Sequence, residues 1–283
     1  MIVDIHTHVF PPAIASRAIA GMQRGSHTAL FTDATETALT ASMRRAGIDR
    51  SVVLPVATSP AQVVKVNDAS LRINERTAET GLISFGCMHP DFGDPEGELR
   101  RIARAGIRGI KLHPVYQRTD IDDPRSLRIL ACAAELGLPV IIHAGWDVGI
   151  PGEAQATPEK VERALDAVGP MTLILAHMGG WRCWDEAANR LAGRGLYIDT
   201  AFSLGPMHPC GDGYYASPED LERLDAEAFV RQVRAFGADR VLFGTDSPWE
   251  DQTAEVNALR ALPLTQDEKD AVLGGNACRL LGL

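Results

Sequence analysis

The stretch "IVDIHTH", residues 2–8, is a short apolar run that ends in two histidines. Its β-branched residues favour a strand, and residues two apart on a strand point to the same face. His6 and His8 would therefore project side by side. Seven further runs of this kind follow, each with a helical pattern after it. The eight predicted strands are residues 2–8, 51–56, 82–88, 107–113, 139–145, 172–178, 196–201 and 240–246.

The segments between these runs carry helix start and stop signals. A proline near the start and a glycine at the end frame "SPAQVVKVNDASLRINERTAETG" (59–81), "DDPRSLRILACAAELG" (122–137) and "TPEKVERALDAVG" (157–169). The C-terminal segment, residues 264–283, predicts two short helices broken at Gly274 and Gly275. Eight strands with intervening helices predict an α/β fold, a (β/α)8 TIM barrel that forms a single domain over residues 1–283. An open doubly wound sheet is the structural alternative.

Composition excludes several classes of protein. The 283 residues are 45% hydrophobic and 23% charged, which is ordinary for a globular protein. A net charge of −9 argues against a nucleic-acid partner, and no run reaches the roughly 20 apolar residues of a membrane helix. The start lacks a signal-peptide pattern, and the five cysteines form no CxxC pair. We therefore expect a cytoplasmic protein with reduced thiols.

Residues able to bind metals or take part in catalysis fall at the ends of the predicted strands. In a (β/α)8 barrel the active site lies at the carboxyl ends of the strands, on one rim. A single histidine at a strand end is more often a structural residue, but several at matching ends indicate a site. They are His6, His8, Lys111, His113, His143, His177 and Asp246.

Four motifs, "DIHTHVFP", "VIIHAG", "LILAHMGG" and "RVLFGTDSPW", occur in this order along the chain. They resemble the amidohydrolase superfamily, and in particular its amidohydrolase-related branch, which includes aminocarboxymuconate semialdehyde decarboxylase and many metal-dependent hydrolases. The resemblance extends over nearly the whole chain and implies a distorted (β/α)8 barrel with one divalent metal. That metal is usually zinc, and manganese is the alternative. Carried over position by position, His6, His8, His143 and Asp246 would be its ligands, with His177 beside it as the acid/base or polarising group.

This ligand set suits the chemistry of the superfamily. Three neutral nitrogens and one carboxylate leave Zn²⁺ positively charged, with room for a water whose pKa falls toward about 7. Asp246 would hold that water and accept its proton, while His177 orients the water or polarises a carbonyl. Asp4 lies on the same face of the strand and would either orient a ligand imidazole or make a structural hydrogen bond.

Lys111 leaves the number of metals open. In binuclear members of the superfamily, a lysine at this strand end is carboxylated and bridges two metals. The amidohydrolase-related branch typically uses one metal without that bridge. We therefore favour a mononuclear site in which Lys111 binds an anionic group of the substrate, over a solvated lysine.

Aromatic and cationic residues of the loops after the strands predict a small, planar or carboxylated substrate. The segment 202–225 would be a lid or an oligomer contact, and we expect a homodimer. Three functions remain open: a hydrolase of a C–N or C–O bond, a non-oxidative decarboxylase on the same metal frame, and a non-catalytic binding relative. The hydrolase is favoured because the chain is compact. The predicted substrate-binding residues are Lys111, His113, Tyr116, Trp146, Trp181, Arg182 and Trp249.

Overall fold

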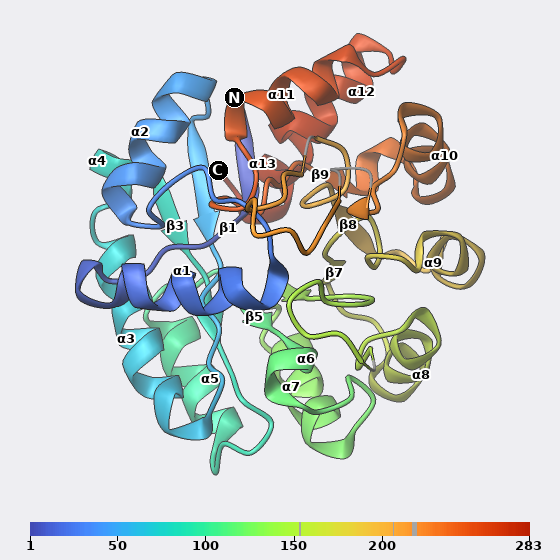
Figure 1. Cartoon of the computed structure of the whole chain (residues 1–283). Coiled ribbons are helices and arrows are strands. Elements are labelled where there is room, and N and C mark those ends of the chain that lie inside the picture. Colours follow the sequence, from blue (N-terminus) through green and yellow to red (C-terminus); the bar gives the residue numbers. More distant parts are fainter. Residues whose placement is uncertain (153, 206, 217–219) are drawn as a thin grey trace. The chain divides into compact units, whose positions relative to one another are not determined.

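The computed structural model describes residues 1–152, 154–205, 207–216 and 220–283 (Figure 1). The chain divides into two compact units. The first unit comprises Met1–Val53, Asp147–Pro151 and Asp199–Leu283, and the second comprises Leu54–Trp146 and Gly152–Ile198. Both units alternate buried strands with helices.

The second unit is built on parallel strands that follow one another in chain order. Gly86 pairs with Ile110, Ile110 with Val140, Val140 with Leu173, and Ile174 with Tyr197. All of these residues except Tyr197 are buried, as is typical of parallel sheets. The strands are β3 (Leu82–Ser84), β4 (Gly86–Cys87), β5 (Ile110–Leu112), β6 (Val140–Ile142), β7 (Leu173–Leu175) and β8 (Tyr197–Asp199), whose last residue belongs to the first unit.

Amphipathic helices connect these strands and pack side by side in the order α3, α5, α7, α8, α9 (Figure 1). Two of them begin at predicted starts, within 122–137 and 157–169, and the helix after Asp94, which was not predicted, begins in the same way. The side chains of Asp94, Asp123 and Thr157 accept hydrogen bonds from backbone N–H groups of the first turn, next to a proline. The helices are η1 (Pro60–Gln62), α3 (Val63–Asn74), α4 (Thr77–Thr80), α5 (Pro95–Arg104), α6 (Pro114–Gln117), α7 (Pro124–Glu135), α8 (Pro158–Val168) and α9 (Trp184–Leu191).

In the first unit, the first and last strands of the chain are neighbours. Strand β1 (Val3–Thr7) pairs in parallel with β2 (Arg50–Val53), and on its other side it bonds the segment that begins with β9 (Val241–Leu242). The N–H of Ile5 donates to the carbonyl of Phe243 at 2.8 Å, and that of Asp246 donates to the carbonyl of His6 at 2.8 Å. Closure of a barrel requires this contact between first and last strands.

The helices of the first unit correct one sequence prediction. Gly274 and Gly275 do not break the C-terminal helix, which continues through a π-helical turn. A Cβ on Gly274 would lie 2.2 Å from the carbonyl oxygen of Met1, so this glycine permits a close backbone approach. The helices are α1 (Pro12–Ser26), α2 (Glu36–Ala46), α10 (Ala226–Phe236), η3 (Ala238–Arg240), α11 (Gln252–Ala261), α12 (Gln266–Asp270), η4 (Ala271–Gly275) and α13 (Asn276–Leu281).

The predicted strands all occur in place, but each is shorter than expected. The third divides at Phe85 into β3 and β4. Ser59 precedes a helical turn as predicted, yet its side chain makes no capping hydrogen bond. Residues 206 and 217–219 of the predicted lid or oligomer segment lie outside the described residues. Within the described part of the chain, no helix combines the length and the apolar character needed to span a bilayer.

Candidate metal centre and active site

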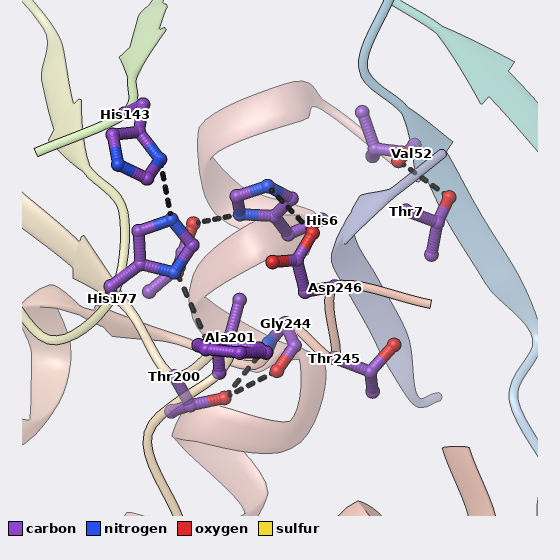
Figure 2. A network of polar contacts seen from close by, with 12 residues as sticks. His6, Thr7, Val52, His143, His177, Thr200, Ala201, Gly244, Thr245 and Asp246 are labelled. Atoms are coloured by element: carbon purple, nitrogen blue, oxygen red, sulfur yellow. Dashed lines mark hydrogen bonds and ion pairs between the residues drawn. The ribbon is translucent and has the colours of Figure 1, made fainter. Parts of the chain in front are cut away.

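The end of β1 brings two imidazoles to one carboxylate. His6 lies in β1 and His8 follows it, and their ring centroids are 5.1 Å apart. Nε2 of His8 lies 3.0 Å from Oδ1 of Asp246, and Nε2 of His6 lies 3.5 Å from the same oxygen. Figure 2 shows His6 beside Asp246. Three side chains with metal-binding atoms therefore converge within the first unit.

The imidazole of His6 is oriented by a carboxylate that sequence reasoning missed. Nδ1 of His6 donates to Oδ2 of Asp199 at 2.8 Å, and both side chains are fully buried. The other ring nitrogen, Nε2, is thereby directed to Asp246. Metal-binding histidines commonly donate their second ring nitrogen to a carboxylate in this way. The only available signal was the position of Asp199, an acidic residue at the end of the predicted strand "LYIDTA".

Asp4 connects β1 to the turn that carries Asp246. Its carboxylate accepts hydrogen bonds from the N–H of His6 and from the N–H and hydroxyl of Thr245, at 3.1, 3.1 and 2.6 Å. The side chain of Gln252 donates a fourth, at 2.7 Å. Burial raises the pKa of Asp4 to about 7 in spite of these donors. Asp4 thus contacts the backbone of His6, the structural role that the sequence left open.

Asp246 and His177 share an unusual backbone conformation. Their φ angles are +54° and +63°, in the left-handed region that non-glycine residues rarely adopt. The carbonyl of His177 accepts a hydrogen bond from Nε1 of Trp184 at 3.0 Å, which helps to hold this turn. Six other described non-glycine residues also have a positive φ, so the conformation alone does not mark a functional site.

The second unit gathers four aromatic rings after β5, β6 and β7. Nδ1 of His143 lies 3.0 Å from Nε2 of His177 (Figure 2). Nε2 of His143 donates to the carbonyl of Trp146, also at 3.0 Å. The ring of His113 is stacked between those of His143 and Tyr116, with centroid distances of 4.3 and 4.0 Å. The predicted ligand His143 and the predicted catalytic His177 are therefore direct neighbours.

The predicted substrate-binding residues are spread over both units. Lys111 lies inside β5 and is 1% exposed, so the alternative of a solvated lysine is wrong. Trp181 is buried and Trp146 is partly exposed, and the N–H of Trp146 donates to the carbonyl of Trp181 at 3.0 Å. The guanidinium of Arg182 lies 4.4 Å from the centre of the Trp181 ring. In the first unit, Trp249 meets His8 edge-on, with centroids 5.7 Å apart.

The predicted metal ligands fit a divalent ion chemically. Histidine and aspartate groups suited to a metal occur among the described residues. His6 has Nδ1 engaged by Asp199, and His143 has Nε2 engaged by the carbonyl of Trp146. Nε2 of His6 is therefore directed to Asp246, whereas Nδ1 of His143 lies 3.0 Å from Nε2 of His177. Imidazole nitrogens and a carboxylate suit zinc and manganese.

Solved structures show which fold this chain has. An uncharacterised TIM-barrel protein from Bordetella bronchiseptica is similar to this chain, at 20% identity and a TM-score of 0.72. The match covers 99% of this chain and 98% of the Bordetella chain. A putative 2-pyrone-4,6-dicarboxylic acid hydrolase from Pseudomonas putida matches over 99% and 97%, at 19% identity and a TM-score of 0.65. A dihydroxybenzoic acid decarboxylase from Polaromonas, solved with manganese and an inhibitor, matches over 100% and 97%, at 15% identity and a TM-score of 0.69. The fold is the predicted (β/α)8 barrel.

The family follows from the sequence. The amidohydrolase family model matches residues 3–283, so the chain belongs to the amidohydrolase family, as the four motifs predicted. No curated protein matches the sequence significantly.

Proposed function

We propose that this protein is a metal-dependent hydrolase that cleaves a C–N or C–O bond, of the amide or lactone type, in a small carboxylated substrate. The observation that carries the proposal is the convergence of the His6 and His8 Nε2 atoms on one oxygen of Asp246, in a chain of the amidohydrolase family. The proposed ligands of a single divalent ion, zinc or alternatively manganese, are His6, His8, His143 and Asp246.

A bound divalent ion would supply positive charge that lowers the pKa of water and polarises a carbonyl. The protein's own groups would then handle the protons. In the proposed reaction, Asp246 accepts a proton from the water that attacks the carbonyl carbon, and the same proton passes to the departing nitrogen or oxygen. His177 stabilises the carbonyl oxygen as negative charge develops on it. The cations of Lys111 and Arg182 are the proposed partners of the substrate carboxylate.

A decarboxylase is the second candidate, because the argument from chain length against it does not hold. The compactness of the chain was the sequence argument for hydrolysis, but the decarboxylase from Polaromonas matches this chain over 97% of its own length. Length therefore does not separate the two reactions. On this alternative the same side chains bind an aromatic acid, and the bond broken joins its carboxylate to the ring.

The test is a screen of lactones, amides and aromatic acids with the zinc-loaded and manganese-loaded protein, followed by Asp246→Asn. A hydrolase incorporates heavy oxygen from labelled water into its product, whereas a decarboxylase releases carbon dioxide. Asparagine keeps the shape of Asp246 without its basicity, so turnover should fall by at least about 10²-fold. Asp212→Asn is the matched control, because Asp212 pairs with His27 at 2.6 Å outside this cluster. Near-normal turnover in Asp246→Asn would contradict the proposal.

A further inference from the structure

The buried amide of Gln117 bonds the backbone at three places in the second unit. Nε2 of Gln117 donates to the carbonyl of Met88 at 2.6 Å and to the carbonyl of Ala57 at 3.1 Å. Oε1 accepts from the N–H of His113 at 3.2 Å. Met88 directly follows β4, and His113 directly follows β5. The side chain thus continues the hydrogen bonding where the strand ladder stops.

Only an amide satisfies all three groups. Two carbonyls need two donors and one N–H needs an acceptor, which is what a glutamine side chain offers. Glutamate would place a second acceptor against carbonyl oxygens, and methionine would offer none of these three hydrogen bonds. Loss of hydrogen bonds to buried backbone groups is destabilising, so neither residue can replace the glutamine without disturbing this part of the backbone.

The backbone N–H that Gln117 accepts from belongs to His113, whose side chain is the central ring of a stack of three. His113 lies between Tyr116 and His143, with interplanar angles of 8° and 14°. Nδ1 of His113 also accepts from the N–H of Tyr116 at 3.4 Å, so the ring is tied to the backbone of its own turn. Moving the backbone of His113 would therefore move a ring that packs against His143.

We propose that Gln117 is a positioning residue that holds the ring of His113 against His143 and so fixes the orientation of that imidazole. This inference rests on the proposed function, in which His143 is a metal ligand and His113 binds substrate. The side chain of Gln117 makes its hydrogen bonds to backbone groups, and Gln117 is not one of the proposed metal ligands. It acts through the end of β5.

Asn67 of α3 provides a matched control. Its side chain also bridges the backbone of β4, accepting from the N–H of Cys87 at 2.8 Å and donating to its carbonyl at 3.2 Å. It also donates to Glu98 at 2.7 Å, and like Gln117 it is buried. Asn67→Asp would disturb the same strand one residue earlier, without a bond to His113.

The experiment compares Gln117→Glu, Gln117→Met and Asn67→Asp. Proton–nitrogen correlation NMR spectra of the histidine rings would be recorded on the metal-free protein, with His113→Gln used for assignment. Zinc affinity would be measured by competition with a chelator, and thermal unfolding would report stability. Both Gln117 variants should shift the His113 resonances and weaken zinc binding about tenfold. Asn67→Asp should lower the unfolding temperature while leaving both other readouts unchanged.

Two results would overturn the inference: unshifted His113 resonances in both Gln117 variants, or equal shifts in Asn67→Asp. A protein that binds neither zinc nor manganese would refute the proposed function instead, and the His113 resonances of the metal-free protein would still decide the role of Gln117.

Discussion

Asp199 offers a direct test of how the candidate metal centre is built. It accepts the Nδ1 proton of His6 at 2.8 Å, with both side chains inaccessible to solvent. Replacing such a partner of a metal-binding histidine typically costs about 10–100-fold in metal affinity. That range corresponds to about 1.4–2.8 kcal/mol of binding free energy. Asp199→Asn keeps an acceptor for Nδ1 but loses the charge, so it should fall near the lower bound, and Asp199→Ala near the upper one.

The assay for Asp199 is a competition titration of zinc against a chromogenic chelator. Asp212→Asn is again the control, because it removes a carboxylate from an imidazole, that of His27, which is not a predicted ligand. Its zinc affinity should equal that of the wild type. If both Asp199 variants also bind zinc within about twofold of the wild type, His6 does not ligate the metal through an Nε2 set by Asp199, and the reasoning fails.

Two further predictions concern other groups. His177→Asn should keep its metal while turnover falls by roughly 10²-fold, as for a positioned acid/base group, and loss of the metal would make His177 a ligand instead. Burial raises the pKa of Glu255 from 4.5 to about 8, so its stabilising contribution is complete below pH 4.5 and is lost as the pH rises through 8. The unfolding temperature of the wild type should fall between pH 5 and 8, and that of Glu255→Gln should fall less. Parallel curves for the two proteins would contradict the raised pKa.

The fold was largely predictable because apolar runs and helix signals are local. The strand positions follow from runs such as "VIIHAG", and proline with glycine marks the helix ends around α7 and α8. The C-terminal glycines misled the prediction, because the close approach of Met1 to Gly274 depends on a distant part of the chain. Sequence shows that a glycine is present but not which backbone lies against it.

The candidate site was predictable only in part. Strand parity placed His6 and His8 on one face, and their approach to Asp246 is seen in the structure. The partners of these residues were not predictable, because Asp199 is 193 positions from His6 and nothing local marks the pair. The sequence places Gln117 in a loop near the predicted substrate pocket, but its three backbone partners were not predictable, because the fold brings them together.

The central claim is that the chain holds one catalytic divalent ion, and elemental analysis of the purified protein tests it most directly. We expect one metal ion per chain, zinc or manganese. The His177→Asn variant should retain this metal, and the His143→Ala variant should lose it. A protein that contains no metal and binds neither zinc nor manganese when they are added would contradict the account. Two metals per chain with a carboxylated Lys111 would contradict its mononuclear form.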